Sequence, residues 1–284
     1  RPITVDELAG FRSALMELCI PVDLSAYDGI DLCGTGGDGK NTFNISTLSA
    51  FVVAACGQHV VKHGNYSVSS SCGSSDVLEH IGYEFTNEQS KLEKQLETCG
   101  ICFLHAPKFH PAMRFVGPVR KQLGVKTFFN MLGPLVNPAR PKKQLAGVFS
   151  HELARIYTYL LQDTDIDFSV IYDLNGYDEC SLTGSAKVFT RDSEAILHPA
   201  DLDLPRITPD EIKGGHAVTD TAADFIEILK GNGTEAQNAV IYANAALALR
   251  TAGKYQTLSD AKAAAEEALQ SGKAYDILKK LITN

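Results

Sequence analysis

The sequence predicts an α/β protein in which a mostly parallel central sheet is covered by helices on both faces. Short apolar segments with strand character alternate with amphipathic segments of helical periodicity through most of the 284 residues. A turn with four glycines follows the first apolar segment, and the chain from Ala236 onward is rich in Ala, Leu, Glu and Lys. The alternation favours strand–helix–strand units, and the final composition predicts two or three closing helices.

The individual elements follow from these patterns. Strands are expected at Gly29–Cys33, His59–Lys62, Ile101–Leu104, Leu145–Val148 and Ser169–Tyr172. Helices are expected at Val5–Cys19, Leu48–Cys56, Asn87–Cys99, His110–Leu123 and His151–Leu161. The first and fourth of these helices are predicted to form all-α material that packs beside the sheet.

Composition limits the class of protein. Hydrophobic residues make up 44% and charged residues 21%, which is typical of a globular domain. No apolar run approaches 18 residues and no secretory leader opens the chain, so we expect neither a membrane span nor export. The seven scattered cysteines indicate reduced thiols in the cytoplasm, and Cys99 and Cys102 are interpreted as core thiols rather than a zinc or redox pair. The net charge of −8 disfavours broad electrostatic binding of nucleic acid.

The most informative segment runs from Ile30 to Thr47. A predicted strand ends in a four-glycine turn, and a Ser, Thr and Asn-rich stretch then opens a helix, an arrangement that typically binds phosphate. A nucleoside-triphosphate P-loop is rejected because Asn41 stands where that motif needs a hydroxyl. A dinucleotide site is rejected because the next predicted strand ends in Lys62 rather than in an acidic residue. A tight turn without a ligand remains the alternative.

Two further segments bring polar groups to strand ends. Lys62-His63-Gly64-Asn65 follows the second predicted strand and can hold phosphate, ribose or a planar substrate, with an exposed turn as the alternative. The Ser67–Ser75 stretch holds six serines and precedes a helix that is predicted to start at Asp76, which favours a second phosphate loop over a plain surface loop.

Two charged groups stand out in the middle of the chain. Arg120 falls on the apolar stripe of the helix predicted at His110–Leu123, so it needs either a planar carboxylate ligand or an internal ion pair. Asp178 and Glu179 follow the strand Ser169–Tyr172 across a turn and suit Mg²⁺ beside a diphosphate, although such pairs are often only solvated. Phe129 to Leu135 predicts a rigid shaped loop.

Together these segments resemble the anthranilate phosphoribosyltransferase family. The matching pieces occur in family order over roughly 30–183 and include Gly34-Thr-Gly-Gly-Asp38, Asn44-Ile-Ser-Thr47, Lys62-His-Gly-Asn65, Gly73-Ser-Ser-Asp76, His110-Pro-Ala-Met113, Val119-Arg120, Phe129 to Pro134, Asn137-Pro138 and Asp178-Glu179. The resemblance implies transfer of phosphoribose from phosphoribosyl pyrophosphate to the amine of anthranilate in tryptophan biosynthesis, with release of pyrophosphate. It also implies a homodimer whose small helical domain comprises 1–25 and about 105–135, and a larger α/β domain that comprises 26–104 and 136–284.

The resemblance also implies roles for individual residues. Phosphoribosyl pyrophosphate would be held by Gly34, Gly37, Asp38, Thr42, Asn44, Ile45, Ser46, Thr47, Lys62 and Ser74. Anthranilate would meet Gly34, His63, Asn65, Met113 and Arg120. Two Mg²⁺ ions are implied, one bound by Ser46 and one by Asp178 with Glu179. No residue is assigned as a general acid or base, because positioning and charge stabilisation account for the chemistry.

Three features depart from the family pattern. Tyr66 stands where the family usually has Arg, and Ser71-Cys72 stand where it usually has Lys-Ser, so positive charge near the phosphates is reduced. The resemblance further predicts helical residues before the position of Val5. Two alternatives stay open: a pyrimidine nucleoside phosphorylase-like enzyme, which shares the fold and uses free phosphate, and a non-catalytic relative that binds nucleic acid.

Overall fold

The computed structural model describes residues 3–66, 72–116, 128–215 and 217–283 of the chain. The strands are β1 Ile30–Gly34, β2 Val60–Gly64, β3 Ile101–His105, β4 Lys143–Val148, β5 Asp167–Asp173, β6 Ala186–Phe189 and β7 Glu194–Leu197. The α-helices are α1 Val5–Leu18, α2 Ile45–Ala55, α3 Ser74–His80, α4 Gln89–Cys99, α5 Ala106–Phe109, α7 His151–Gln162, α8 Val218–Glu227, α9 Glu235–Thr251, α10 Leu258–Gln270 and α11 Lys273–Thr283.

The seven strands form one sheet in the order β3-β2-β1-β4-β5-β6-β7, and the pairs from β3 through β5 are parallel. The prediction of a mostly parallel sheet is therefore confirmed, and each of the five predicted strands lies within two residues of an observed one. β6 and β7 were not predicted, and both pairs that they form, β5 with β6 and β6 with β7, are antiparallel.

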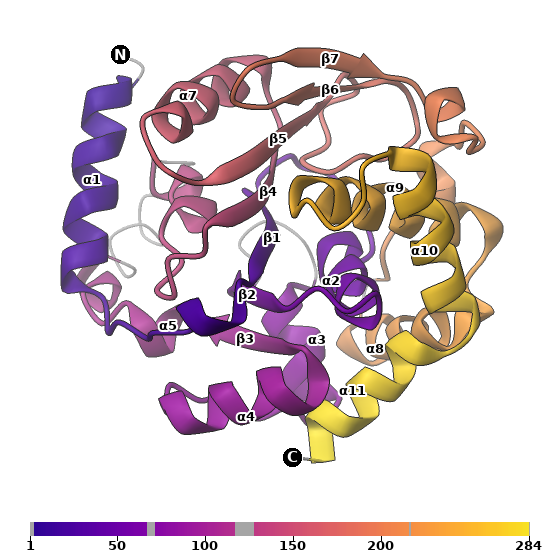
Figure 1. Cartoon of the computed structure of the whole chain (residues 1–284), viewed down its shortest axis with the longest axis horizontal. Coiled ribbons are helices and arrows are strands. Elements are labelled where there is room, and N and C mark those ends of the chain that lie inside the picture. The colour runs from indigo at the N-terminus through magenta and orange to yellow at the C-terminus, as the bar shows by residue number, and fades with distance from the viewer. Residues whose placement is uncertain (1–2, 67–71, 117–127, 216, 284) are drawn as a thin grey trace.

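Alternate side chains of the strands enter separate cores on the two faces of the sheet. On one face, side chains such as Leu32 and Phe103 join α2, α9 and the other C-terminal helices in the largest buried cluster. On the other face, Val148 and Val170 pack against α7 together with Leu8 of α1. Figure 1 shows these two layers, with α1 and α7 on one side of the strands and α9 to α11 on the other.

The helical predictions are also largely confirmed. The segment after Ala236 forms three helices, α9 to α11, and α1, α4 and α7 begin or end within two residues of their predicted bounds. α2 starts three residues earlier than predicted, and α3 starts at Ser74 rather than at Asp76. The segment predicted as a helix at His110–Leu123 begins with a turn and has helical backbone at 113–116, while its remainder lies outside the described residues.

The strand order fixes where a ligand site can form. β2 pairs with β1 on one side and β4 pairs with it on the other, both in parallel, so the direction in which successive strands are added to the sheet reverses between β1 and β4. The loops that leave the carboxyl ends of these two strands diverge and leave a crevice, which is where open parallel sheets bind ligands. Gly34 and Gly147 are register partners at this edge.

Candidate active site

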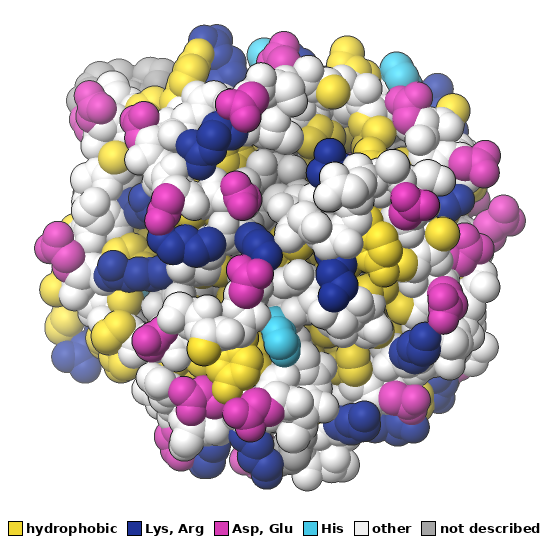
Figure 2. Space-filling view, in the orientation of Figure 1, with side chains coloured by type: hydrophobic (Ala, Val, Ile, Leu, Met, Phe, Trp, Pro, Cys, Tyr) yellow, Lys and Arg dark blue, Asp and Glu magenta, His cyan; other side chains and the backbone are white. Residues whose placement is uncertain are grey.

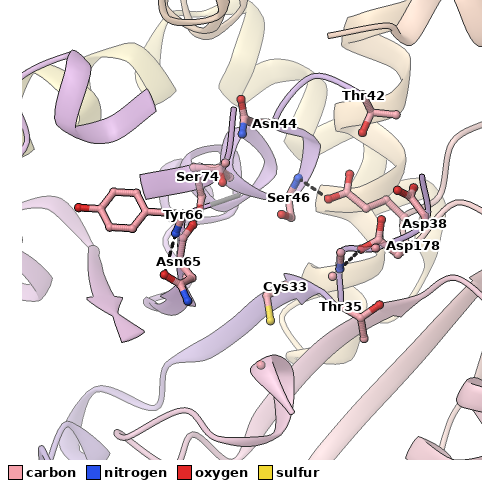
Figure 3. Close-up of a pocket in the computed structure, with 18 of the residues that line it drawn as sticks. Cys33, Thr35, Asp38, Thr42, Asn44, Ser46, Asn65, Tyr66, Ser74 and Asp178 are labelled. Atoms are coloured by element: carbon pink, nitrogen blue, oxygen red, sulfur yellow. Dashed lines mark hydrogen bonds between the residues drawn. The ribbon is translucent and has the colours of Figure 1, made fainter. Parts of the chain in front are cut away.

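A cleft of about 270 Å³ opens at the carboxyl ends of β1 and β2. It brings together thirteen of the predicted site residues: Gly34, Gly37, Asp38, Thr42, Asn44, Ser46, Thr47, Lys62, His63, Asn65, Ser74, Asp178 and Glu179. Figure 3 shows Asp38 and Asp178 on one side of this cleft and Asn65, Tyr66 and Ser74 on the other, with Ser46 between them. Segments that lie more than 100 residues apart in the chain therefore meet at one place.

Three predicted residues are not part of this lining. Ile45 is buried in the main core, where its side chain supports the first turn of α2. Met113 is half-buried and does not line the cleft among the described residues. Arg120 lies outside the described residues. Their roles remain predictions from the family resemblance.

The glycine turn after β1 takes its shape from backbone that other residues rarely adopt. Gly36, Gly37 and Gly39 have φ values of 66°, 78° and 74°, in the left-handed region that favours glycine. The turn leads to α2, whose N-cap residue Asn44 makes no side-chain cap to the helix. The first N–H groups of α2 therefore bond outside the helix: that of Ile45 donates to the Phe43 carbonyl at 2.7 Å, and that of Ser46 donates to Glu179 at 3.1 Å.

Asp178 and Glu179 accept hydrogen bonds from the glycine turn and from the start of α2, respectively. The Gly36 N–H donates to Asp178 Oδ2 at 2.7 Å, and the Ser46 N–H donates to Glu179 Oε1 at 3.1 Å. Glu179 Oε2 is buried and has no hydrogen-bond partner. Burial and the nearby charge of Asp38 raise the pKa of Asp178, and burial with the charge of Asp178 raises the pKa of Glu179. These carboxylates are held in an environment that favours an added cation.

Two glycines at the strand tips make room for this acidic pair. A methyl group on Gly34 would meet the Asp178 carboxylate, and one on Gly147 would meet the Asp178 backbone carbonyl. The pair is fixed from behind by Asn244 of α9, whose side chain accepts from the Cys180 N–H at 3.1 Å and donates to the Cys180 carbonyl at 2.9 Å. Sequence reasoning did not identify Gly147 or Asn244, since neither belongs to a recognisable local motif.

Lys62 is the cation at the base of the cleft. Its side chain is almost fully buried at 2% exposure, and its ammonium group donates to the Leu32 carbonyl and to Ser46 Oγ at 3.3 Å. The buried carboxylate of Asp31 lies nearby on β1 and accepts from the His63 N–H at 3.1 Å. Burial raises the pKa of Asp31 to about 6, although the Lys62 charge acts in the opposite direction. The sequence analysis did not identify Asp31, because a single Asp inside a predicted strand belongs to no recognisable site motif.

His63 and Asn65 lie at the opposite wall. His63 Nδ1 lies 3.0 Å from the Gly133 carbonyl, and its Nε2 is buried without a hydrogen-bond partner. Burial, followed by the charge of His110, lowers the pKa of His63 to about 3, so the ring is neutral near pH 7. The Asn65 side chain accepts from the Tyr66 N–H at 2.8 Å, and its backbone carbonyl accepts from the N–H of Ser75 at 3.4 Å.

Two of the residues that depart from the family pattern, Tyr66 and Cys72, line the cleft. Tyr66 lines it, donates to Glu79 at 2.8 Å and contacts the His105 ring edge-on at a centroid distance of 4.7 Å. Cys72 also lines the cleft and is buried, whereas Ser71 lies outside the described residues. Phe129, Asn130 and Gly133 from the loop predicted to be rigid complete the wall.

The fit of this site to Mg²⁺ can be judged from its donors. Asp178, Glu179 and Ser46 supply hard oxygen ligands, and the unpartnered Glu179 Oε2 is a buried acceptor without a donor. Within the described ranges, no group of three or more His, Cys, Asp or Glu side chains is arranged to hold a metal by itself. Both facts suit Mg²⁺, which typically takes one or two carboxylates and fills its other positions with water and substrate phosphate.

Comparison with known proteins identifies the family. Residues 26–275 match the model described as "Glycosyl transferase family, a/b domain". Over 281 residues the chain is 55% identical to anthranilate phosphoribosyltransferase of Flavobacterium psychrophilum and 56% identical to that of Christiangramia forsetii, covering 99% of this chain and 85% of each relative. This chain belongs to the anthranilate phosphoribosyltransferase family. It is therefore an enzyme that transfers a phosphoribosyl group.

Solved structures of the same family agree with the fold. The anthranilate phosphoribosyltransferase of Thermus thermophilus superposes with a TM-score of 0.93 at 36% identity, covering 100% of this chain and 85% of that one. The Saccharomyces cerevisiae enzyme in complex with PRPP and Mg superposes with a TM-score of 0.90 at 29% identity, covering 99% of this chain and 80% of that one. Neither the nucleoside phosphorylase alternative nor the nucleic-acid-binding alternative is favoured by these relatives.

Two surface observations complete the comparison. On the face shown in Figure 2, Lys and Arg side chains are interspersed with Asp and Glu, and no continuous basic surface is seen there. Within the described part of the chain, no helix combines the length and the apolar character that crossing a membrane requires.

Proposed function

We propose that this chain transfers the 5-phosphoribosyl group from phosphoribosyl pyrophosphate to the amine of anthranilate, giving N-(5-phosphoribosyl)anthranilate and pyrophosphate in tryptophan biosynthesis. One observation carries the proposal: the glycine turn, the start of α2, Lys62 and the acidic pair line a single cleft in a member of this family. A sugar diphosphate needs this combination of amide donors, a cation and a metal-binding edge.

The donor substrate is assigned to the part of the cleft formed by β1 and α2. The glycine turn and the residues at the start of α2 line the cleft, and Lys62 adds a positive charge whose ammonium group donates to Ser46 Oγ at 3.3 Å. We assign the phosphoribosyl pyrophosphate contacts to Gly34, Gly37, Asp38, Thr42, Asn44, Ile45, Ser46, Thr47, Lys62 and Ser74. Ile45 contributes only through its backbone, because its side chain is buried in the core.

Mg²⁺ is proposed as the cofactor, and two ions are proposed. The Saccharomyces cerevisiae relative was solved with PRPP and Mg, which supports the choice of metal. Ser46 would hold one ion, and Asp178 with Glu179 would hold the other. When bound, Mg²⁺ would neutralise negative charge on the departing diphosphate. The residues themselves position it, since Asp178 and Glu179 are fixed by the Gly36 and Ser46 amides.

The acceptor is assigned to the side of the cleft formed by β2 and the loop at 129–133. The Saccharomyces cerevisiae relative was also solved in complex with 4-fluoroanthranilate, which supports an aromatic acid at this family's site. We assign anthranilate contacts to Gly34, His63, Asn65, Met113 and Arg120. His63 is neutral and lines the cleft, so its planar ring can meet anthranilate without adding charge.

The reaction requires little covalent chemistry from the protein. The C1–O bond breaks and its electron pair leaves with pyrophosphate, the anthranilate nitrogen forms the new bond to C1, and the amine releases one proton to water. Lys62 and the amides of the glycine turn stabilise the charge that grows on the leaving group. The cleft aligns the amine with C1, and no side chain is assigned as a general base.

The assembly and location of the enzyme are also proposals. We propose a homodimer that uses the helical residues within 1–25 and 105–135, with 26–104 and 136–284 as the donor-binding domain. The interleaving of these ranges follows the family resemblance. A cytoplasmic location is proposed from the cysteines, since none of the seven forms a disulfide in the described part of the chain.

The function is tested by a direct assay. Purified chain with Mg²⁺, phosphoribosyl pyrophosphate and anthranilate should consume the anthranilate fluorescence, and omission of the donor should abolish the loss. Thymidine with inorganic phosphate serves as the second substrate pair. Folded protein that leaves anthranilate unchanged, or that cleaves thymidine instead, contradicts the proposal.

Arg120 provides the sharpest test of the acceptor site. Arg120→Ala should raise the anthranilate KM by about 10- to 100-fold, because a charged hydrogen bond to a carboxylate is worth roughly 1.5–3 kcal/mol. The KM for phosphoribosyl pyrophosphate should change far less. Steady-state kinetics with each substrate varied in turn measures both values. Unchanged anthranilate kinetics would instead assign Arg120 to an internal ion pair.

A further inference from the structure

The loop that carries Asp178 and Glu179 joins β5 to β6 and starts at a buried carboxylate. β5 ends at Asp173, and β6 begins at Ala186, the register partner of Asp173. Asp173 is fully buried, at 0% exposure, and it does not line the active-site cleft. The transferase chemistry proposed above gives this side chain no role, so its burial needs another explanation.

The Asp173 side chain accepts hydrogen bonds from both ends of the loop. Its Oδ1 accepts from the Asn175 N–H at 2.8 Å. Its Oδ2 accepts from the Ser181 N–H at 3.1 Å and from the Ser181 hydroxyl at 2.6 Å. One side chain therefore ties the segment 174–180 back to the end of β5, and Asp178 and Glu179 lie within this closed segment.

Further hydrogen bonds hold the two ends of the closed segment to each other. The Thr183 N–H donates to Ser181 Oγ at 3.0 Å, and the Asn175 side chain donates to Thr183 Oγ1 at 2.9 Å. Ser181 and Thr183 are buried, like Asp173. These four residues form a connected network, which we call the loop clamp, and a connected network of this kind favours a single arrangement of the segment that it closes.

The loop clamp requires an ionised carboxylate at Asp173. Two N–H groups and one O–H group point at its two oxygens, and a carboxylate offers acceptors at both, whereas an amide would turn its NH₂ group toward one set of these donors. Among the ion pairs formed within the described ranges, none includes Asp173. Burying a charge without an ion pair costs free energy, which the three hydrogen bonds offset.

The position of the loop clamp in the chain links it to the acidic pair. Ser181 follows Glu179 by two residues, so the bonds from Ser181 to Asp173 fix the backbone directly after the pair. Asn175 precedes Asp178 by three residues, so the backbone before the pair is fixed as well. Ligands whose backbone is fixed in advance lose less conformational freedom when they bind.

We propose that Asp173 is a positioning residue for the metal-binding pair. Through Ser181 it closes the segment 174–180 and so presents the Asp178 and Glu179 carboxylates to Mg²⁺. This inference rests on the metal site of the proposed function. Without the loop clamp both carboxylates remain, but the segment that carries them can move. Loss of groups that support metal ligands typically weakens metal binding by about 10- to 100-fold, and we expect the lower end of this range because Asp173 acts through the backbone.

The test uses the full chain with Mn²⁺ as the probe, and the electron paramagnetic resonance signal of the free ion measures binding. Asp173→Asn should raise the Mn²⁺ Kd about tenfold. Ser181→Ala keeps the N–H bond but loses the hydroxyl bond, so its effect should be smaller. The double variant should show less than the product of the two single effects, because both changes remove the same hydroxyl bond. The Mg²⁺ concentration for half-maximal activity should rise in the same order, while the anthranilate KM changes far less.

Ser169→Ala is the matched control for Ser181→Ala. Ser169 is also buried, lies on β5, accepts from the Thr251 hydroxyl at 2.7 Å and does not line the cleft. This variant loses one buried hydroxyl bond in the neighbouring strand and should leave the Mn²⁺ Kd unchanged. Circular dichroism and urea unfolding report the folding and stability of each variant.

The outcomes separate this inference from the metal site on which it rests. If Asp173 only stabilises the fold, Asp173→Asn and Ser181→Ala lower the free energy of unfolding but leave the Mn²⁺ Kd of the folded protein unchanged, and the proposal is overturned. Independent, fully multiplicative effects in the double variant would also overturn the route through Ser181. Unaltered chain that binds no Mn²⁺ would instead overturn the proposed metal site, and this inference with it.

Discussion

The two ends of the sheet use charge in opposite ways. At the carboxyl ends of the strands, Lys62 is buried and Asp178 and Glu179 are half-buried, and each is hydrogen-bonded to backbone or side chain of the cleft. At the amino ends, Arg12 is half-buried and Arg140 is exposed, and both are anchored by single bonds to carbonyls. A buried charge interacts strongly with its neighbours, and leaving it unpaired costs free energy, whereas water screens the interactions of exposed charges. Substitutions at the carboxyl end should therefore have much larger effects.

The largest effect is expected from removing the acidic pair. Asp178→Asn with Glu179→Gln should lower kcat/KM by about a thousandfold, because metal stabilisation of the leaving group is worth several kcal/mol. The Mg²⁺ concentration needed for half-maximal activity should also rise. Steady-state kinetics over a Mg²⁺ titration measures both. Asp165→Asn removes a carboxylate at the other end of the sheet and is the control, which should retain nearly full activity.

The second-largest effect on activity is expected from Gly147, whose lack of a side chain leaves room for the loop that carries Asp178 and Glu179. Gly147→Ala places a methyl group against the Asp178 backbone carbonyl, so the loop that carries both carboxylates has to move. A displacement of about 1 Å at a catalytic site costs roughly a hundredfold in rate. Kinetics should show this loss while circular dichroism remains that of the folded chain. Gly10→Ala is the matched control, because a methyl group there meets no atom within 4 Å. Equal activity of both variants would contradict this reading of Gly147.

The site residues that could be predicted from the sequence differ from those that could not in how far along the chain their partners lie. The glycine turn, the Lys62 segment and the acidic pair are contiguous local motifs, so spacing and residue type were enough to place them at strand ends. Gly147, Asn244 and Asp31 act through neighbours far along the chain, and no local pattern distinguishes them. β6 was not predicted because Ala186–Phe189 contains only four residues, two of them buried, and its pairing is set by β5.

A third prediction concerns pH and the buried ring of His63. The pKa of His63 is lowered from 6.5 to about 3 by burial, so the unfolded chain binds a proton in this range that the folded chain does not. Stability should therefore fall as pH drops below 6.5, by about 2 kcal/mol at pH 5 relative to pH 8. His63→Gln should remove this part of the pH dependence. Urea unfolding at both pH values measures the free energy of unfolding of each protein. An equal loss of stability from pH 8 to pH 5 in the two proteins would contradict the assignment.

The smallest effect is expected from the ion pair at the amino end of the sheet. Lys142 and Asp165 form a salt bridge, but their side chains are 63% and 73% exposed. Water and salt screen such a pair, and holding two long side chains in one geometry costs entropy, so the net contribution is typically below about 1 kcal/mol. Lys142→Ala should therefore change the free energy of unfolding by no more than about 0.5 kcal/mol in urea titrations. The buried counterpart is Lys62→Ala, which leaves Ser46 and the Leu32 carbonyl without their donor and should cost several times more. If the two lysine variants lost equal stability, burial would not be what separates the two ends of this sheet.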